Sequence, residues 1–396
     1  MTEPAALPPT AQPAPGQVDP APRAPGRIDR SDPDRRLRVA VVFGGRSSEH
    51  SVSCQTARGV LAALDPARYD VVPIGIARDG RWVLESTDLR RFALDGPAAS
   101  AVADDAAPVL LPPGNASLTV VPPGAPPWEI GAVDVVFPLL HGPFGEDGTL
   151  QGLLEMAGVR YVGSGVLASA AAMDKHVAKV LLAAAGLPVG RWVVVPPDSP
   201  VDAVREQITA LGLPVFVKPA RAGSSFGISR VDDPAALDEA VRRAAEHDPK
   251  VLVEAAVAGR ELECGVLGGA EGRRPQASVV GEITVAAGRD FYDFEAKYSA
   301  AAGTELAVPA DLPAATAGRV RDQAVRAFLA LGCEGLARVD FFLRPDGELV
   351  VNEVNTLPGF TEQSMFPRLW AASGVDYPSL VDRLVALAAA RPVGLR

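Results

Sequence analysis

The sequence predicts a mixed α/β and α+β protein, in which an N-terminal βαβ domain is followed by two further units. Three observations predict this class. A continuous apolar run at 38–43 suits a buried parallel strand, and two glycines and a helical pattern follow it. A helix with Asp174 as its N-cap opens the second unit, where helix and strand patterns alternate. A strand–turn–strand pattern at 336–356 marks the third unit.

The division of the chain follows from these patterns. Residues 1–36 are interpreted as a disordered tail, because nine prolines and few bulky apolar residues cannot offset the entropy of ordering. The N-terminal α/β domain is predicted to span 37–173. The second unit is predicted to span 174–258, and the third, which carries the hairpin, 259–396.

Bulk composition restricts the partners. The chain of 396 residues has a formal net charge of −10, which argues against nucleic acid or an anionic membrane as its main partner. The N-terminus lacks the basic-then-apolar order of a signal peptide, and no apolar run reaches membrane-spanning length. Cys54, Cys264 and Cys333 form no metal-binding spacing, so we interpret them as reduced thiols of a cytoplasmic protein.

The first domain is predicted to contain strands at 38–43, 71–77 and 133–139, with a helix after Gly44-Gly45. Continuous apolar runs of this kind are typical of parallel strands that are buried on both faces. The stretch 95–130 is rich in Pro, Gly and Ala, and it is predicted to be a long surface excursion.

Two polar residues of this domain follow strand ends. Glu49 comes just after the Gly44-Gly45 turn, and His141 opens the Gly-rich segment 141–148, which precedes a helix. Ligands bind at the carboxyl ends of the strands in an α/β sheet, so both residues are candidates for a site. Two alternatives remain. Glu49 would be an acidic residue in the first turn of a helix, where its charge interacts favourably with the helix dipole. His141 would be an exposed histidine in a Gly-rich turn.

Lysines and a Gly/Ser loop mark the second unit. The 38 basic side chains include five lysines, namely Lys175, Lys179, Lys218, Lys250 and Lys297. A compact, flexible ammonium suits phosphates better than a guanidinium does at some positions, which makes these lysines candidates. The loop 222–227 follows Lys218-Pro219 and contains Ser224 and Ser225. Its glycines, amides and hydroxyls would allow close approach to phosphates, although a simple hairpin turn would look similar.

The hairpin of the third unit carries the most informative polar groups. Alternate residues of a strand share a face, so Arg338 and Asp340 point the same way. Glu353 and Asn355 share a face of the second strand, and a four-residue turn at 345–348 would place Asp340 opposite Glu353. These oxygen ligands suit Mg²⁺ bound together with nucleotide phosphates. The alternative is a solvated sheet face with surface ion pairs.

The segment 291–299 mixes aromatic and charged residues within a Gly/Ala-rich stretch, and it includes Lys297 and Tyr298. A loop of this kind could close over a site and exclude water. An ordinary packed surface loop is the alternative.

The order of the motifs is more specific than any one of them. They run as Gly-Gly with a following Glu, His-Gly…Gly-Glu-Asp-Gly, Met-Asp-Lys, Val-Lys-Pro…Gly-Ser-Ser, Tyr-Asp…Lys-Tyr, Arg-Val-Asp and Asn-Glu-Val-Asn-Thr-Leu-Pro-Gly-Phe-Thr. In this succession the chain resembles the D-alanine–D-alanine ligases of the ATP-grasp superfamily, from about Arg38 to Leu387. The resemblance implies a pre-ATP-grasp domain that helps to hold the amino acids, followed by a two-domain ATP-grasp fold that grips ATP.

The resemblance also implies the ligands of ATP and of its metal ions. The residues that would contact the phosphates, the adenine and the ribose are Lys175, Lys218, Ser225, Lys297, Glu254, Val257 and Glu261. Asp340, Glu353 and Asn355 would hold two Mg²⁺ ions, with Mn²⁺ as an alternative. This assignment agrees with the hairpin geometry described above.

The implied reaction joins two D-alanine molecules in two steps. The first D-alanine carboxylate attacks the γ-phosphate of ATP, which gives an acyl phosphate and ADP. The amine of the second D-alanine then attacks the activated carbonyl, and phosphate leaves. Phosphoryl transfer needs chiefly positioning and charge neutralisation. Arg338 and the backbone amide of Gly359 would stabilise the tetrahedral oxyanion.

The substrate side of the site is assigned in the same way. Glu49 would bind the ammonium group of the first alanine and hydrogen-bond toward Ser224 and Tyr298. His141 would lie near the carboxylate of that alanine. Two residues would hold the carboxylate of the second alanine, Ser364 and Met365. The resemblance implies a cytoplasmic homodimer whose product supplies peptidoglycan synthesis.

Three alternatives remain at this point. A D-alanine–D-lactate ligase would share nearly all the motifs, but such enzymes typically lack the pair Lys297-Tyr298. Another ATP-grasp carboxylate–amine ligase would keep the metal hairpin but not the motifs around His141 and Ser364. A non-catalytic ATP-binding regulator should have lost Arg338 or a metal ligand, and this chain has lost neither.

Overall fold

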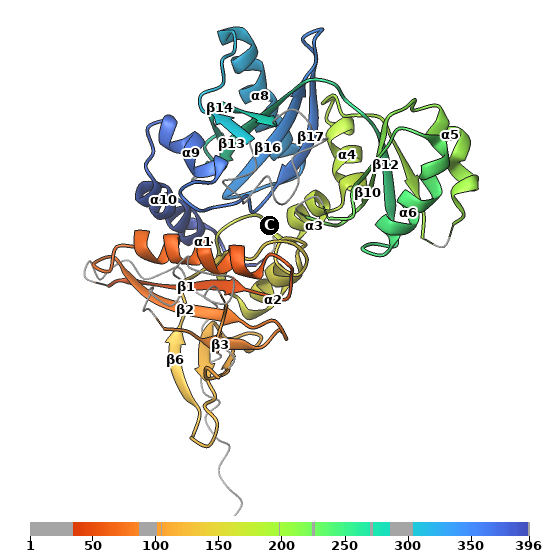
Figure 1. Cartoon of the computed structure of the whole chain (residues 1–396). Helices are drawn as coiled ribbons and strands as arrows, with labels where there is room; N and C mark the ends of the chain where they lie inside the picture. Colours follow the sequence, from red (N-terminus) through yellow and green to blue (C-terminus); the bar gives the residue numbers. More distant parts are fainter. Residues whose placement is uncertain are drawn as a thin grey trace, which may run out of the picture.

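The computed structural model of the chain describes residues 35–86, 101–103, 105–197, 199–223, 226–269, 272–285 and 304–394. Within these residues the strands form four sheets (Figure 1). The strands are β1 (Leu37–Gly44), β2 (Tyr69–Ile76), β3 (Trp82–Leu84), β4 (Val109–Leu110), β5 (Ser117–Val120), β6 (Trp128–Ala132), β7 (Val135–Pro138), β8 (Arg160–Tyr161), β9 (Trp192–Val195), β10 (Val215–Pro219), β11 (Ser229–Val231), β12 (Val251–Ala255), β13 (Arg260–Leu267), β14 (Gln276–Val285), β15 (Thr304–Ala307), β16 (Leu336–Leu343) and β17 (Leu349–Asn355). The α-helices are α1 (His50–Ala63), α2 (Thr149–Ala157), α3 (Val166–Met173), α4 (Lys175–Ala184), α5 (Arg205–Thr209), α6 (Leu237–Ala245), α8 (Ala314–Ala330), α9 (Met365–Ala372) and α10 (Tyr377–Ala390).

The first sheet has the strand order β3-β2-β1-β7-β8, and β1 pairs in parallel with both β2 and β7. Its central strand is buried on both faces. Val39, Val41 and Phe43 face a core that includes residues of α1 and α10. Ala40 and Val42 face a second core on the other side of the sheet. The three strands predicted for this domain are therefore confirmed, and the carboxyl ends of β1 and β7 lie at one edge of the sheet.

The prediction of a surface excursion at 95–130 is wrong for the part that the structure describes. Strands β4, β5 and β6 form an antiparallel sheet of their own. Val109, Leu118 and Val120 pack against the first sheet. The three strands are only two to five residues long and alternate with Pro- and Gly-containing turns, so the composition hides them. In Figure 1 the end of this sheet that carries β6 extends away from the rest of the molecule.

The central sheet is antiparallel and has the order β11-β10-β12-β9. Helices α5 and α6 cover one face, where Val217 and Val253 contribute to the core. Because side chains alternate along a strand, Lys218 and Glu254 point to the opposite face. That face is turned toward the cavity described below.

The C-terminal sheet is antiparallel and has the order β15-β14-β13-β16-β17. Helix α8 covers one face, where Val320 and Phe328 pack with Val339 and Phe341. Helix α9 packs against β13 and β14. The face of β16 and β17 away from α8 carries the polar residues of the predicted metal hairpin.

The last helix, α10, returns to the first sheet and was not predicted. Leu380 and Leu384 are fully buried in the core that contains β1 and α1. The hydroxyl of Tyr69 donates to Asp382, and the hydroxyl of Tyr377 donates to the carbonyl of Phe360 at 2.8 Å. In Figure 1 α10 lies between α1 and the C-terminal sheet. This helix thus joins the C-terminal part of the described chain to the N-terminal domain.

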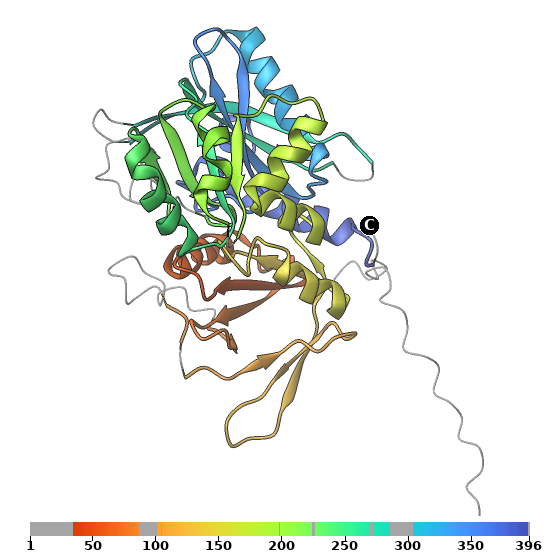
Figure 2. The same ribbon diagram turned by 90° about the vertical axis from the view of Figure 1, so that its right-hand side faces the viewer.

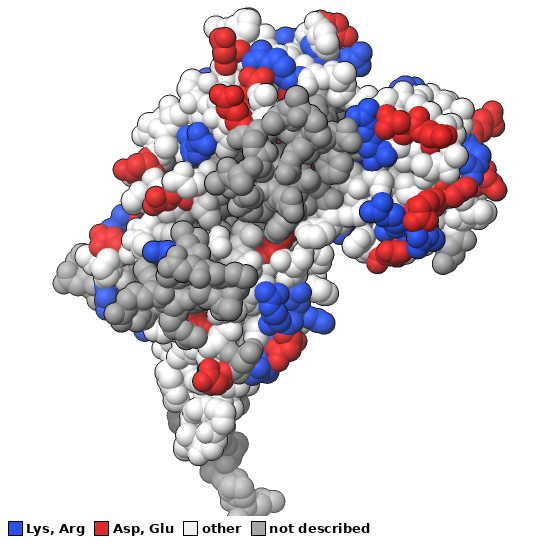
Figure 3. Space-filling view, viewed as in Figure 1, with Lys and Arg blue, Asp and Glu red and all other residues white. Residues whose placement is uncertain are grey.

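Figures 1 and 2 show the N-terminal domain on one side of the molecule and the central and C-terminal sheets on the other. Acidic and basic side chains of the described residues lie interspersed on the face shown in Figure 3. The three cysteines are buried and free, and burial raises the pKa of each thiol to about 12. Over the described ranges, no helix has the length and apolar character needed to cross a membrane.

Candidate active site

A cavity of about 320 Å³ lies where the first, central and C-terminal sheets meet. The carboxyl edge of the first sheet, the open face of the central sheet and the hairpin β16–β17 each contribute a wall. Twelve of the residues predicted for the site line this cavity, namely Glu49, His141, Lys175, Lys218, Glu254, Val257, Glu261, Arg338, Asp340, Glu353, Asn355 and Gly359. Residues far apart in the sequence are thereby brought to one place.

The hairpin carries a β-bulge that sets the direction of its acidic side chains. Asp340 pairs with Glu353, as predicted, but Phe341 pairs with Val351, so the register nearer the turn is shifted by one residue. Asn352 is therefore the extra residue of the bulge. Without this bulge, the register near the turn would continue and would place Asp340 opposite Asn352. Glu353 would then point to the face covered by α8.

Three carboxylates lie in a row across the C-terminal sheet, because Asp340 pairs with Glu263 of β13 on one side and with Glu353 on the other. Arg338 compensates part of this charge. Its Nε and Nη2 donate to the two oxygens of Asp340, both at 2.7 Å, and Nε lies 2.9 Å from Oε2 of Glu263. The amide of Asn355 donates to Oδ2 of Asp340 at 3.0 Å. The four side chains are thus fixed by one another in a nearly buried network.

Two lysines share one carboxylate on the central sheet. Nζ of Lys218 lies 2.8 Å from Oε2 of Glu254, and Nζ of Lys179 lies 3.3 Å from Oε1. Burial alone would raise the pKa of Glu254, but the two ammonium groups lower it to about 2. Burial lowers the pKa of Lys179, which is 3% exposed. The carboxylate therefore stays charged and holds both lysines beside the cavity.

Lys175 is the first residue of α4, and its ammonium donates to the carbonyl of Ala222 at 2.7 Å. This contact attaches α4 to the chain that leaves β10. The next residue, Gly223, lies against the first domain, since a Cβ at this position would be 3.2 Å from Oε2 of Glu49. The Glu49 carboxylate therefore sits between the two halves of the molecule.

Gly142 lies between two carboxylates of the cavity wall that the first sheet contributes, which we call the N-terminal wall. Its amide donates to Oε1 of Glu146 at 2.6 Å, and a Cβ on it would be 3.1 Å from Oε2 of Glu49. Burial and the nearby charge of Glu49 raise the pKa of Glu146 to about 8. Burial lowers the pKa of His141, and its Nε2 has no hydrogen-bond partner within the described residues. This wall can therefore accept a cation and a hydrogen-bonding group.

Comparison with known proteins decides the family. The family described as "D-ala D-ala ligase N-terminus" matches residues 38–164, and "D-ala D-ala ligase C-terminus" matches residues 181–386. The chain belongs to the D-alanine–D-alanine ligase family. This confirms the predicted membership, which rested on the order of the motifs.

Relatives and solved structures agree over most of the chain. The D-alanine–D-alanine ligase of Kineococcus radiotolerans is 59% identical over 371 residues, which are 91% of this chain and 98% of that protein. That of Arthrobacter sp. (strain FB24) is 55% identical over 365 residues, 91% and 96% of the two chains. The VanG D-Ala:D-Ser ligase of Enterococcus faecalis superimposes with a TM-score of 0.78 at 37% identity, covering 89% of this chain and 100% of that one. The D-alanine–D-alanine ligase of Coxiella burnetii gives 0.76 at 34% identity, covering 89% and 94%. The predicted fold class is confirmed.

Six of the residues predicted for this D-alanine–D-alanine ligase site do not appear in the cavity lining. Ser364 lies beside the cavity, because a Cβ on Gly359 would be 3.2 Å from its Oγ. Met365 begins α9, and its side chain is buried against Gly281 of β14. The other four lie outside the described residues, namely Ser224, Ser225, Lys297 and Tyr298.

Three charged residues of the cavity lining were given no role in the predicted site, namely Glu146, Glu263 and Lys179, although Lys179 was among the five candidate lysines. Glu146 is part of the Gly-Glu-Asp-Gly motif, which already pointed to it. Lys179 is one of only five lysines and follows Lys175 by one helical turn. Glu263 shares a strand face with Glu261, but no local pattern indicates that β13 lies beside β16.

Proposed function

We propose that this chain joins two D-alanine molecules to D-alanyl-D-alanine, with conversion of ATP to ADP and phosphate, through an acyl phosphate. One observation carries the proposal. Lys175 and Lys218, the polar hairpin with Arg338, and the carboxylate of Glu49 all line one cavity of the family fold. A site of this kind combines groups for a triphosphate with groups for an amino acid.

The nucleotide would lie between the central and C-terminal sheets. Lys175 and Lys218 would contact its phosphates, and Lys297 and Ser225 would join them. Glu254 and Val257 would line the adenine pocket, where the apolar side chains Phe216, Ile228 and Phe342 also line the cavity. Glu261 would meet the ribose. The ion pair between Lys218 and Glu254 supports this arrangement, because it holds the Lys218 ammonium beside the cavity.

The donor set of the hairpin fits Mg²⁺. Asp340, Glu353 and Asn355 offer two carboxylates and an amide. Nδ2 of Asn355 lies 3.0 Å from Oδ2 of Asp340 and 3.5 Å from Oε1 of Glu353. Within the described residues no three His, Cys, Asp or Glu side chains gather closely enough to hold a metal by themselves. Mg²⁺ commonly binds one or two carboxylates together with substrate phosphates, so this set suffices. The ions would supply charge neutralisation at the transferring phosphate.

The amino acids would lie between the hairpin and the N-terminal wall. Glu49 would bind the ammonium of the first D-alanine, and neutral His141 would hydrogen-bond near its carboxylate. Arg338 and the amide of Gly359 would stabilise the oxyanion that forms when the second amine attacks. Ser364, with the start of α9 at Met365, would hold the carboxylate of the second D-alanine. Ser224 and Tyr298 would complete the network around Glu49.

We further propose the domain division at residues 36, 173 and 258, and a homodimer that works in the cytoplasm. The first sheet ends at Tyr161, the central sheet spans 192–255, and the C-terminal sheet begins at Arg260, which supports this division. Family membership supports the assembly and the location.

A product assay tests the function. Purified full-length chain is incubated with ATP, Mg²⁺ and an equal mixture of D-alanine, D-lactate and D-serine, and all products are quantified. We expect D-alanyl-D-alanine and ADP in equal amounts, with little mixed product near neutral pH. Predominant D-alanyl-D-lactate or D-alanyl-D-serine would replace the proposal by a ligase of that specificity. ATP binding without any ligation product would indicate the regulator instead.

A further inference from the structure

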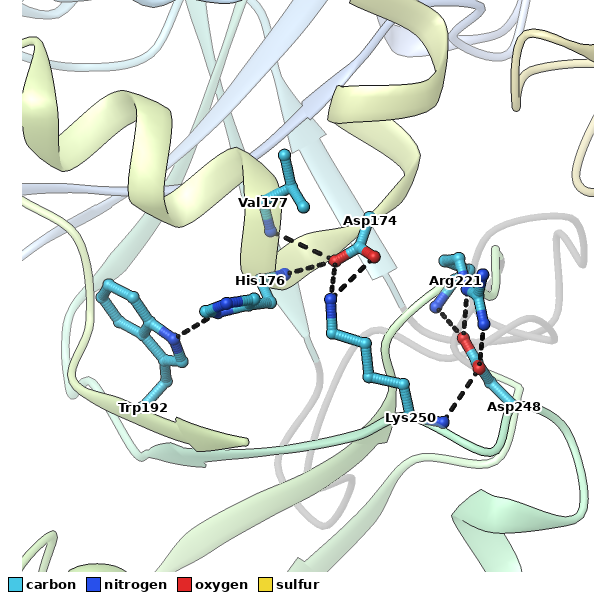
Figure 4. Close-up of polar contacts among 7 residues, drawn as sticks. All are labelled: Asp174, His176, Val177, Trp192, Arg221, Asp248 and Lys250. Atoms are coloured by element: carbon cyan, nitrogen blue, oxygen red, sulfur yellow. Dashed lines mark hydrogen bonds and ion pairs between the residues drawn. The ribbon is translucent and has the colours of Figure 1, made fainter. Parts of the chain in front are cut away.

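Three segments meet just outside the cavity and are bound to one another by two aspartates. They are the start of α4, the chain that leaves β10, and the turn that leads into β12. Figure 4 shows this group, which we call the brace, with Asp174 and Asp248 as its centres. Asp174, Arg221, Asp248 and Lys250 belong to the brace, and none of them lines the cavity.

Asp174 joins the start of α4 to the turn before β12. Its Oδ1 accepts hydrogen bonds from the backbone amides of His176 and Val177, both at 3.1 Å, which caps the helix. The ammonium of Lys250 lies 2.9 and 2.8 Å from its two oxygens. Both side chains are nearly buried, at 13% and 19% exposure, so water weakens this pair less than a surface pair.

Asp248 joins the same turn to the chain that leaves β10. It accepts hydrogen bonds from the backbone amide, Nε and Nη2 of Arg221, at 2.8, 2.9 and 2.7 Å. It also accepts from the amide of Lys250 at 3.0 Å. The backbone adds a further bond, from the amide of Ala220 to the carbonyl of Lys250 at 2.9 Å. The Asp248 side chain is 3% exposed, whereas that of Arg221 is half-exposed, so the carboxylate end of this charge-assisted set is the part shielded from water.

A second attachment holds the first turn of α4 from the other side. Nε1 of Trp192, on β9, donates to Nδ1 of His176 at 3.0 Å (Figure 4). The indole has only a donor, so Nδ1 of His176 must be unprotonated. Burial, followed by the charge of Lys250, lowers the pKa of His176, which keeps this acceptor available.

The brace reaches the cavity through Lys175. The amide of Lys175 donates to the carbonyl of Ala220 at 3.0 Å, and its ammonium donates to that of Ala222 at 2.7 Å. Lys175 is therefore fixed between two of the segments that the brace connects. Gly223, which lies against Glu49, is the residue after Ala222 in the chain. A shift of the turn before β12 would move the lysine and the chain at 220–223 together.

We propose that Lys250, Asp174, Asp248 and Arg221 are positioning residues for the nucleotide, which fix the Lys175 ammonium and the chain at 220–223 in the orientation that ATP requires. The inference rests on the proposed function, in which Lys175 contacts the phosphates of ATP. Lys250 itself is turned away from that role, since both oxygens of Asp174 hold its ammonium. Small displacements of a positioned group cost affinity and rate without loss of the fold.

Four full-length proteins test the proposal: the wild type, Lys250→Met, Lys250→Arg and Asp238→Asn. Lys250→Met keeps most of the stem and removes the ammonium, whereas Lys250→Arg keeps a cation. Asp238→Asn is the matched control, because it breaks the 2.7 Å pair with Arg205 on the exposed side of the same unit. For each protein we measure KM for ATP, KM for D-alanine, kcat, ADP affinity by titration with Mg²⁺, and Tm.

We expect Lys250→Met to raise KM for ATP and the dissociation constant of ADP by about tenfold, with KM for D-alanine within about twofold. Lys250→Arg should restore most of the affinity, and Asp238→Asn should match the wild type. Unchanged nucleotide affinity in a folded Lys250→Met protein would overturn the proposal, and so would an equal loss in Asp238→Asn. If Lys250→Met does not fold, Asp174→Asn is measured instead, because it keeps the cap acceptor and loses the charge.

The ADP titrations separate this inference from the proposed function. A wild-type chain that binds ADP but makes no dipeptide would refute the proposed reaction, and the variants would still test the brace. A wild type that makes dipeptide, with variants of unchanged ADP affinity, would refute the brace alone.

Discussion

The hairpin wall and the N-terminal wall of the cavity balance their charges in different ways. On the hairpin, Arg338 lies between Asp340 and Glu263, and Asn355 donates to the same aspartate. On the N-terminal wall, the carboxylates of Glu49 and Glu146 both lie against Gly142. The charge of Glu49, after burial, raises the pKa of Glu146 to about 8.

The difference indicates which ligand each wall is arranged to receive. The hairpin wall holds three carboxylates and one guanidinium in a fixed arrangement, so it stays net negative and is preorganised for a cation such as Mg²⁺, which would neutralise a bound phosphate. Two crowded carboxylates are stabilised when a cation arrives, because an opposite charge nearby favours their ionised forms. The ammonium of an amino acid is such a cation. The two walls thus divide the proposed reaction into a phosphate side and an amino-acid side.

The largest effect is expected at the hairpin. Asp340→Asn keeps the size of the side chain but removes a proposed Mg²⁺ ligand and the partner of Arg338, so kcat should fall by about 1,000-fold or more. The control is Asp346→Asn, because Asp346 lies in the exposed turn of the same hairpin. ADP release in the presence of D-alanine is measured for both. A near wild-type rate of ADP release in Asp340→Asn would contradict the assignment of Asp340 as a Mg²⁺ ligand.

The pairing of β16 with β17 was predicted from the sequence only in part. Alternation and the turn residues predicted correctly that Asp340 lies opposite Glu353. They did not predict the bulge at Asn352, because the polar pattern 352–355 is compatible with either register until the core on the other face is known. Glu263 was missed for a related reason, since the neighbour of β16 is a strand about 70 residues earlier in the chain.

Local signals were sufficient elsewhere. The N-cap Asp174 was predicted from its place before an apolar helix, and its two backbone hydrogen bonds confirm it. The ion pair of Asp174 with Lys250 could not be predicted, because it joins residues 76 positions apart. Helix α10 was not predicted, and its packing against α1, β7 and β8 could not have been, since an apolar periodicity shows a buried face but not the partner of that face.

The second prediction concerns the acidic wall. Glu49→Gln removes the charge proposed to bind the substrate ammonium, so kcat/KM for D-alanine should fall by about 100-fold, while KM for ATP stays within about threefold. Asp70→Asn on β2, whose partner Arg38 lies outside the cavity lining, is the control. Steady-state kinetics with each substrate varied in turn separate the two effects. An equal loss for both substrates would contradict the division of the walls.

A smaller effect is expected where the central sheet faces the hairpin. Lys218→Arg keeps the positive charge but replaces a compact ammonium with a planar guanidinium, which cannot keep the same contact with Glu254. KM for ATP should rise by about five- to tenfold, with little change in KM for D-alanine. Arg230→Lys, at the exposed position of the edge strand β11, is the control. Identical ATP kinetics in Lys218→Arg would place this lysine away from the phosphates.

The smallest effect on activity is expected at Glu146. Here the crowding of the two carboxylates should show instead in how the free energy of unfolding depends on pH. The folded chain keeps the proton of Glu146 up to a pKa of about 8, whereas the ordinary value of 4.5 applies when the chain unfolds. Between these values the folded state binds more protons, so the stability contributed by this group is present below pH 4.5 and is lost as the pH rises toward 8. Glu146→Gln imitates the protonated form and removes this loss.

We therefore expect Glu146→Gln to gain stability relative to the wild type as the pH rises from 5 to 8.5, by a few kcal/mol at most, because this side chain of the cavity lining is only partly buried. Activity near pH 7 should stay within about threefold, since an amide can still accept the hydrogen bond from the Gly142 amide. Thermal unfolding across this pH range is compared with that of Asp147→Asn, a neighbouring position outside the cavity lining. Parallel curves for wild type and Glu146→Gln would mean that Glu146 is ionised in the folded chain. The two carboxylates would then both be charged, and the positive charge of Lys175, which already opposes the rise of the Glu146 pKa, would compensate part of their charge.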